Sequence, residues 1–374
     1  MIEQSVHLLK DGLGYALSRL MRTDLMLLGL VMMLSAIGFI ALFSAGYSFP
    51  WRIEDQLRNI IVAGVVMLIF TLIPLSVLRR CAVPLFILGC LLLLATHLIG
   101  ITVKGATRWL NVGVRIQPSE IMKLAVPLML AWYYQRRQDA LSWTDHVVSL
   151  ILLAIPVCLI LKQPDLGTSI LVTIAGLSVI FFAGLDIRVI LTALGAGIAS
   201  LPIIWSQLYD YQRERILTLI DPTNDPLGKG FHTLQALIAI GSGGFSGKGW
   251  MEGTQAHLDF IPERTSDFLF AVFSEEFGFV GNLVLLALYS LLIARCFWIA
   301  ANATTMFARL LSASIGVIFF TYTFVNMGMV SGILPVVGVP LPFMSYGGTA
   351  LLILGMCTGI LLSVAIDSHT KKHR

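Results

Sequence analysis

The chain has 374 residues, of which 57% are hydrophobic and 12% are charged. Soluble globular proteins carry about 25% charged residues, and apolar runs of about 20 residues recur along this whole chain. Lipid is therefore the solvent for most of it. The net charge of +4 is spread between the apolar runs and forms no basic stripe, so it gives no indication of nucleic-acid binding. The five cysteines and seven histidines show neither disulfide nor metal-type spacing.

The first 23 residues do not read as a cleavable signal peptide, because no A-x-A-like site separates a short apolar core from a polar mature start. Leucine and methionine recur there at helical spacing, with Lys10, Arg19 and Arg22 among them. This pattern predicts an interfacial helix on the cytoplasmic surface. A frayed tail is the alternative.

Ten apolar segments predict an all-α polytopic membrane bundle that forms a single domain over residues 1–374. The predicted helices span residues 24–45, 57–75, 82–102, 118–135, 146–162, 166–184, 187–206, 267–295, 306–331 and 347–368. An even number of crossings places both termini on one side. Loops on that side hold thirteen Lys and Arg residues, whereas the short loops opposite hold six, so both termini are predicted to be cytoplasmic.

The connection at residues 207–266, between the seventh and eighth helices, is predicted to be extracytoplasmic. Connections longer than about 15 residues are usually functional or disordered. Apolar patches at residues 216–220 and 234–240 argue against disorder. They predict short amphipathic helices that pack over the outer surface of the bundle.

Polar segments on the outer side are candidates for chemistry. In the first, after Arg115, Pro118 suits the first position of a helix and Glu120 its first turn. Lys123 lies three residues after Glu120, so the two side chains can pair. A buried ammonium near the bilayer indicates a functional site, and a lysine that snorkels toward the helix end is the alternative.

Two further segments have simple structural explanations. At residues 162–168, Asp165 suits the cap of the next helix. Residues 241–249 resemble a phosphate-binding P-loop, but Ser242 stands where its first glycine belongs and Gly249 replaces its Ser or Thr. This glycine turn is also predicted to lie outside the cell, away from ATP. A turn that approaches a substrate headgroup remains as an alternative.

Residues 260–270 contain the principal candidate for catalysis. Thr265 or Ser266 can cap the following helix, which would place Asp267 in its first turn. The alternative is that Asp267 is a general base at the lipid–water boundary. Glu275 and Glu276 follow in the same helix and are expected to line a polar cleft or rise above the bilayer, because exposure to lipid is costly.

An uncharged stretch at residues 331–348 contains three prolines and several glycines, which forbid a simple helix. Irregular backbone at membrane depth survives only where protein buries it or where it lines a wet cavity. This stretch is therefore a candidate wall for an apolar-tail site, and a plain outer loop is the alternative.

Taken in order, these segments resemble the SEDS family (shape, elongation, division, sporulation) over residues 24–368. The strongest marks are residues 115–123, 163–168, 253–255 leading into 262–268, and 334–348. The chain is most similar to the rod-shape branch, RodA, and less similar to the division branch, FtsW. The common family form has His-Thr before the acid, whereas this chain has Thr265 and Ser266.

The resemblance implies a peptidoglycan glycosyltransferase that polymerises lipid II, a disaccharide-peptide on undecaprenyl pyrophosphate, at the outer face of the cytoplasmic (inner) membrane during cell elongation. It implies a class B penicillin-binding protein as transpeptidase partner, together with other elongation-complex membrane proteins. The family's essential acid matches Asp267, and its functional lysine and glutamate match Lys123 and Glu120. A lipid II flippase and a non-catalytic scaffold for a cell-wall synthase are the competing functions.

In this chemistry a sugar 4-hydroxyl loses a proton to Asp267 as it attacks the growing chain, and the pyrophosphate leaving group needs positive charge. The candidate substrate-binding residues are Lys123, Glu120, Arg115, Arg108, Arg213, Lys248, Glu263, Arg264, Gln163, Asp165 and Ser345. A divalent cation, Mg²⁺ or Mn²⁺, that bridges Asp267 and the pyrophosphate is an open alternative, although the sequence shows no dedicated ligand cage.

Overall fold

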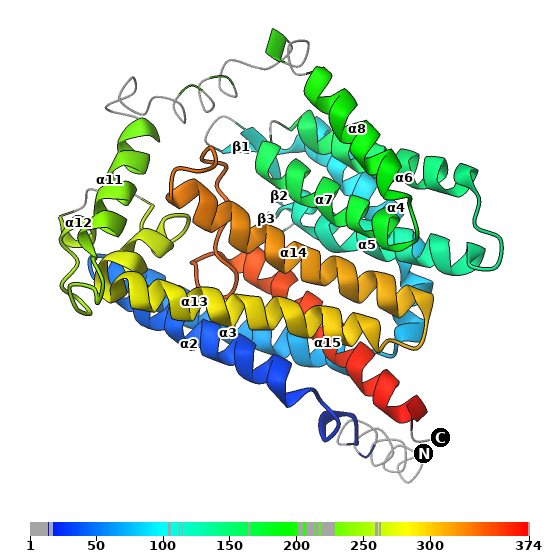
Figure 1. Ribbon diagram of the computed structural model, residues 1–374, viewed down its shortest axis with the longest axis horizontal. Helices are drawn as coiled ribbons and strands as arrows, with labels where there is room; N and C mark the ends of the chain where they lie inside the picture. Colours follow the sequence, from blue (N-terminus) through cyan, green and yellow to red (C-terminus); the bar gives the residue numbers. More distant parts are fainter. Residues whose placement is uncertain are drawn as a thin grey trace.

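A computed structural model of the chain (Figure 1) describes residues 14, 18–103, 106–111, 113, 115–163, 165–200, 205–206, 213, 217, 229–258, 261 and 263–372. The described residues form ten main helices, each of which overlaps one predicted segment. They are α2 (Leu25–Ala45), α3 (Pro50–Leu72), α4 (Leu75–Ile99), α5 (Pro118–Arg137), α6 (Trp143–Leu161), α7 (Leu166–Phe182), α8 (Ile187–Ala199), α13 (Leu269–Ala301), α14 (Met306–Val330) and α15 (Gly348–Lys372). All of them except α8 pack closely on one another.

Seven of these helices are long and apolar enough to cross a membrane, namely α2, α3, α4, α6, α13, α14 and α15. The helix α7 is apolar but has 17 residues, and α5 carries charged residues at both of its ends. The helices α3 and α4 each begin seven residues before their predicted starts, because their first turns are polar or follow a proline and lie outside the apolar run.

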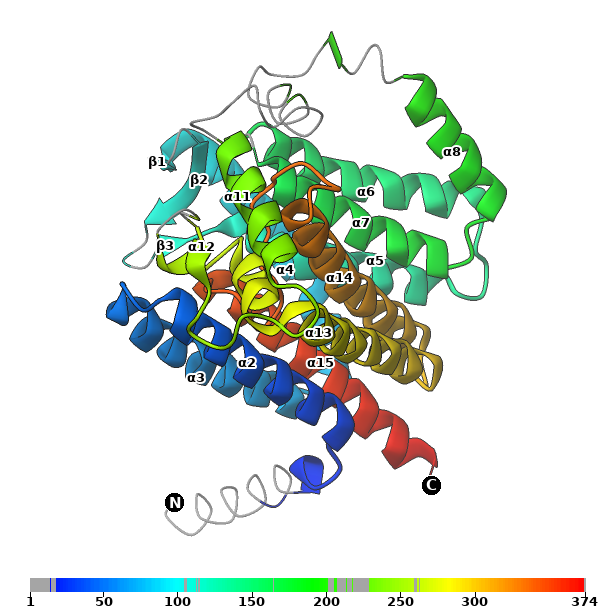
Figure 2. The same ribbon diagram turned by 60° about the vertical axis from the view of Figure 1, so that its left-hand side comes forward.

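The helices α14 and α15 form the centre of the bundle, where most of their side chains are buried against other helices. Figure 2 shows α14 surrounded by α5, α7, α13 and α15. A polar side chain on α14 consequently meets protein rather than lipid, and such a position can hold a functional group at membrane depth.

A small antiparallel sheet, which the sequence analysis did not predict, accompanies the predicted helical bundle. Its strands β1 (Ile101–Val103), β2 (Ala106–Asn111) and β3 (Arg115–Ile116) lie in the order β1-β2-β3 between α4 and α5. The prediction missed them because strands of two to six residues are too short to establish an alternating pattern. The sheet covers the end of the bundle at which α5 begins.

The predicted long loop does contain short helices where the structure describes it. They are α11 (Lys229–Ser242) and α12 (Thr254–His257). The helix α11 packs against α13 and α14, at the end of the bundle opposite the C-terminus (Figure 1). The prediction of short helices over the bundle surface is confirmed for this part of the loop.

The helix α13 is broken near its start by Gly278, whose φ of 63° is not helical. The glycine turn at residues 241–249 fills the break. Lys248 N donates to Glu275 O at 3.0 Å, and Phe279 N donates to Gly244 O at 2.9 Å. Backbone groups in a membrane protein must be paired internally, and here a loop supplies the partners that the helix lacks.

Two ion pairs show which helix ends lie together. Arg19, before α2, lies 3.3 Å from Asp367 near the end of α15. Asp24, which caps α2, lies 2.7 Å from Arg295 in the last turns of α13. The start of α2 and the ends of α13 and α15 therefore share one end of the bundle. The predicted interfacial helix over residues 1–23 lies mostly outside the described residues.

Candidate functional site

A buried ion pair on α5 forms one part of the site. Pro118 begins this helix and Glu120 lies in its first turn, as predicted. Lys123 Nζ lies 2.6 Å from Glu120 Oε1 and donates to Tyr322 Oη at 2.5 Å. The lysine is only 3% exposed, so it does not snorkel into solvent and the functional interpretation gains support.

The second carboxylate oxygen of Glu120, Oε2, is buried and has no hydrogen-bond partner among the described residues. Such an atom costs free energy unless a further donor reaches it. A substrate hydroxyl or a water molecule would satisfy it.

Asp267 lies in a turn at residues 263–268 and not in the first turn of α13, which begins at Leu269. The predicted cap by Thr265 or Ser266 is therefore wrong. Both residues are engaged elsewhere, because Arg52 donates to the Thr265 hydroxyl and Ser266 donates to Glu263 Oε2 at 3.1 Å. Asp267 is half-buried, at the end of α13 opposite Arg295.

The proline- and glycine-rich stretch at residues 331–347 faces the Asp267 carboxylate. Gly338 has a φ of 76°, and a Cβ atom at this position would lie 3.4 Å from Asp267 Oδ2. Asn326 of α14 donates to Asp267 O at 2.9 Å and to Val339 O at 2.7 Å. The acid is thus enclosed by its own turn, this stretch and α14.

The same helix joins the acid to the ion pair. Tyr322, the partner of Lys123, and Asn326, the partner of Asp267, are one turn apart on α14. Residues at i and i+4 lie on one helix face. The structure consequently brings Lys123, Glu120 and the backbone of Asp267 to adjacent turns of one buried helix.

A second polar group surrounds Asp165. This residue caps α7 by accepting from Thr168 N at 3.2 Å, so the predicted cap is confirmed. Its other oxygen accepts from Gln117 Nε2 at 3.2 Å, and Arg108 Nη1 lies 3.7 Å from Oδ1. Gln117 is the N-cap residue of α5, so this group ties β2 and the start of α5 to the start of α7.

Gln163 lies beside this group and is 2% exposed. It donates to Leu93 O at 3.0 Å, while its Oε1 has no partner among the described residues. Gln163 thus secures α4 to the end of α6 and leaves one buried acceptor unpaired.

Several predicted binding residues have structural partners instead. Arg264 donates to Ala45 O at 2.7 Å and so closes the end of α2. Ser345 accepts from Leu341 N at 3.0 Å within its own turn. Both side chains are buried and bind the protein itself, so each has a structural role that its polarity alone does not indicate.

Lys248 also stabilises the fold. Its Nζ lies 2.6 Å from Glu275 Oε1, which holds the glycine turn on α13. Glu276 accepts from the Ser44 hydroxyl. Both glutamates are almost completely buried against protein groups, so they avoid lipid by burial within the fold and do not line an open cleft.

The other two predicted binding residues, Arg213 and Arg115, have described contacts away from Asp267. Arg213 donates to the carbonyl oxygens of Trp205 and Ser206 at 3.1 and 2.9 Å. Arg115 pairs with Asn111 in the small sheet, and its side chain lies outside the described part of the structure.

Sequence reasoning missed Tyr322, Asn326, Gln117 and Arg52. The first two were detectable, because a tyrosine and an asparagine four residues apart in an apolar helix already indicate a polar face. In the sequence Arg52 is one of several loop charges. In the structure it binds Thr265 and lies 6.0 Å from the centre of the Tyr346 ring.

The Tyr346 side chain lies beside Arg52 and the Asp55 carboxylate. Burial, and then the nearby Asp55 carboxylate, raise the pKa of Tyr346.

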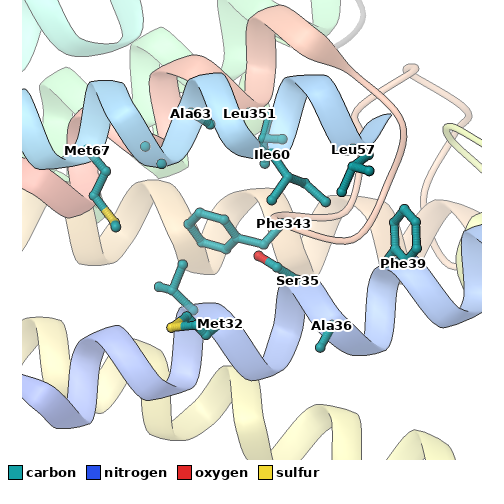
Figure 3. A pocket seen from close by; sticks show the side chains of 13 residues that line it. Met32, Ser35, Ala36, Phe39, Leu57, Ile60, Ala63, Met67, Phe343 and Leu351 are labelled. Atoms are coloured by element: carbon teal, nitrogen blue, oxygen red, sulfur yellow. The ribbon is translucent and has the colours of Figure 1, made fainter. Parts of the chain in front are cut away.

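An apolar cavity of about 330 Å³ opens between α2, α3 and α15 (Figure 3). Its walls include Met32 and Phe39 from α2, Leu57 and Met67 from α3, and Phe343. Phe343 belongs to the stretch that faces Asp267, and its φ of 63° is rare for a residue with a side chain. The prediction that this stretch walls an apolar site is consistent with this arrangement.

Comparison with known proteins decides the family. The family model for cell cycle proteins of the FtsW, RodA and SpoVE type matches residues 16–371. The chain belongs to the SEDS family. This SEDS protein is 49% identical over 334 residues to the peptidoglycan glycosyltransferase MrdB of Escherichia coli (strain K12), an alignment that covers 89% of this chain and 90% of MrdB.

The similarity extends to more distant members and to solved structures. The probable peptidoglycan glycosyltransferase FtsW of Trichlorobacter lovleyi is 34% identical over 362 residues, which are 93% of this chain and 94% of the relative. Among solved structures, a peptidoglycan synthase complex that coordinates polymerization and crosslinking aligns with a TM-score of 0.81 at 32% identity. Thermus thermophilus RodA aligns with a TM-score of 0.70 at 30% identity, and each alignment covers 93% of this chain and 98% of the other.

Proposed function

We propose that this peptidoglycan glycosyltransferase polymerises lipid II at the outer face of the bacterial cytoplasmic membrane, with Asp267 as its general base. The placement of Asp267 supports this proposal. Its half-buried carboxylate lies beside the backbone at Gly338. The backbone of Asp267 is bound on α14 one helix turn from a buried lysine–tyrosine contact. An acid at the membrane boundary next to a polar interior suits proton abstraction from a sugar hydroxyl.

All ten main helices cross the membrane in this proposal, with both termini in the cytoplasm. The ion pairs of Arg19 and Asp24 bring the start of α2 and the ends of α13 and α15 to one end of the bundle. The sheet, α11 and the Asp267 turn lie at the other end (Figure 2). The excess of Lys and Arg on the side of the termini supports the orientation.

In this proposal, fewer cationic side chains stabilise the leaving pyrophosphate than the sequence analysis predicted. Arg108 retains 30% side-chain exposure beside Asp165, so it can reach a phosphate at the outer surface. Lys123 and Glu120 together are neutral and buried, which suits binding of sugar hydroxyls and orientation of the substrate. Lys248 and Arg264 act in folding.

The apolar cavity accepts part of the undecaprenyl chain. It opens toward lipid between α2 and α3, and its wall residue Phe343 lies five residues from Gly338, which faces Asp267. A long apolar chain gains free energy with each buried methylene, about 0.8 kcal/mol apiece. Such binding would hold the carrier while its pyrophosphate lies near the acid.

Cell elongation is the proposed setting, because identity to MrdB, at 49%, exceeds identity to FtsW, at 34%. A class B penicillin-binding protein would cross-link the new glycan, as the related complex couples polymerization to crosslinking.

The test uses the purified chain with its transpeptidase partner in liposomes that contain lipid II. Wild type should make glycan polymer, and Asp267→Ala should make none while it folds and binds its partner normally. Asp186→Ala removes an exposed carboxylate elsewhere on the chain and should leave polymerisation unchanged. Polymer made by Asp267→Ala at the wild-type rate would refute the assignment, and transfer of intact lipid II between leaflets without polymer would indicate a flippase.

A further inference from the structure

Asn326 is fully buried in the last turns of α14, where a carboxamide is costly unless it is hydrogen-bonded. Its Nδ2 donates to two backbone carbonyl oxygens, Asp267 O at 2.9 Å and Val339 O at 2.7 Å. These two acceptors fix the orientation of the amide, because an amide oxygen in that place could accept from neither.

The two carbonyl groups belong to the two segments that enclose the carboxylate. One is the backbone of Asp267 itself. The other follows Gly338, at which a Cβ atom would lie 3.4 Å from Asp267 Oδ2. A single side chain of α14 therefore holds the turn that carries the acid and the stretch that faces it.

The other side of the amide is unused. Asn326 Oδ1 is buried and accepts no hydrogen bond from the described residues. An unpaired buried acceptor costs free energy. The favourable contribution of Asn326 at this position therefore comes from its donor group. Leucine would fill the same space without this cost.

The same helix sets the distance to the lysine. Tyr322 precedes Asn326 by one turn and accepts from Lys123 Nζ. Because α14 is continuous between the two residues, it acts as a rigid spacer between the Asp267 segment and the ion pair on α5.

We propose that Asn326 is a positioning residue that sets the Asp267 carboxylate relative to Lys123 and Glu120. The proposal deepens the proposed function and rests on Asp267 being the base. A misplacement of about 1 Å in an active site can cost about 100-fold in rate. Loss of the amide donors should therefore lower kcat, whereas substrate affinity, which depends on other groups, should be retained.

Two variants and a matched control test this role in the full chain with its transpeptidase partner. Asn326→Asp keeps the shape and replaces the amide donor, which serves two acceptors, with a carboxyl group that can donate at most one hydrogen bond. Asn326→Ala removes the side chain without adding charge. Thr323→Val removes a buried hydroxyl of the same helix whose hydrogen bond, among the described residues, stays within that helix, at Phe319 O. We expect kcat to fall about 10- to 100-fold in both Asn326 variants with KM within about twofold, and no change in Thr323→Val.

A second measurement does not depend on catalysis. Hydrogen-exchange mass spectrometry should show faster exchange in peptides containing Asp267 and in those containing Val339, for both Asn326 variants and not for Thr323→Val. Should Asn326→Asp fail to fold, Asn326→Ala provides both measurements.

Unchanged exchange in both segments would overturn the positioning role, as would a KM effect without a kcat effect. An equal loss in Thr323→Val would assign the effect to packing of α14 and would also overturn it. If the wild-type protein makes no polymer, the proposed function fails, and hydrogen exchange still decides whether Asn326 holds the two segments.

Discussion

Lys123 Nζ donates to the hydroxyl oxygen of Tyr322 at 2.5 Å, and it lies 4.8 Å from the centre of the Tyr322 ring. Both residues are almost completely buried. The tyrosine thus provides a polar contact for an ammonium group that the bundle removes from water. This contact joins α5 to α14 at the depth of the proposed site.

Tyr322→Phe should lower both stability and activity. The change deletes one acceptor of a buried cation, and hydrogen bonds to charged groups are worth about 1.5–3 kcal/mol. We expect a lower thermal unfolding midpoint and a polymerisation rate reduced about tenfold or more. Tyr133→Phe, which removes a hydroxyl bound to Asp145, is the control and should retain polymerisation. Wild-type rates in Tyr322→Phe would argue against a role for this contact.

The Glu120–Lys123 pair should behave as one unit. Breaking a buried pair by removing one partner costs about 3–5 kcal/mol, because a charge is left uncompensated. Glu120→Gln and Lys123→Met should each lower the unfolding midpoint strongly, and the double variant should lose less than the sum of the two. Additive losses in a double-mutant cycle would show that the two charges are not coupled. All three variants should be inactive in polymerisation.

Gly338→Ala tests the stretch that faces the acid. The glycine has a φ of 76°, and the added Cβ would lie 3.4 Å from Asp267 Oδ2. Backbone strain of this kind costs about 1–3 kcal/mol, and we expect a large loss of polymerisation. Gly184→Ala has the same type of strain, at a φ of 112° in open space. It should lose stability to a similar degree and retain activity, which separates strain from an effect on the carboxylate.

Gly64→Leu tests the apolar cavity. Gly64 lines the cavity and has no atom within 4 Å of an added Cβ, so leucine should fill the space without a clash. We expect KM to rise for lipid II with its full undecaprenyl chain, and to change little for an analogue with a short chain. Gly29→Leu, at another open glycine outside the cavity lining, is the control. An equal effect on both substrates would remove the cavity from the lipid-binding site.

Metal removal tests whether a divalent cation stabilises the leaving pyrophosphate. The described residues contain no group of three or more His, Cys, Asp or Glu side chains that could hold a metal ion. Mg²⁺ commonly binds one or two carboxylates together with substrate phosphates, and in the alternative with a bridging cation Asp267 would supply one such carboxylate. We expect chelation with EDTA to stop polymerisation and Mg²⁺ or Mn²⁺ to restore it. Full activity after exhaustive chelation would show that protein cations suffice.

Periodic apolar runs were sufficient to predict the ten helices, and spacing was sufficient to predict the Glu120–Lys123 pair and the cap by Asp165. Each of these features depends on residues that are close in sequence. The polar face of α14 that carries Tyr322 and Asn326 can be recognised in the sequence. Its pairing with Lys123 and Asp267 depends on how distant helices pack, and no local pattern encodes that packing. Arg264 and Lys248 illustrate the same limit. Arg264 binds the end of α2 and Lys248 holds the glycine turn on α13, and the sequence does not distinguish such structural cations from cations that bind a phosphate.

The interlocked glycines at the break in α13 have a consequence for comparative studies of the family. A Cβ atom at Gly247 would lie 2.1 Å from Glu276 O, and one at Gly278 would lie 2.2 Å from Gly247 N. Because backbone blocks both positions, no compensating substitution elsewhere can relieve the overlap. If these glycines are invariant among homologues, the close backbone packing is sufficient to explain it. Their invariance would not be evidence that the turn contacts the sugar or the lipid.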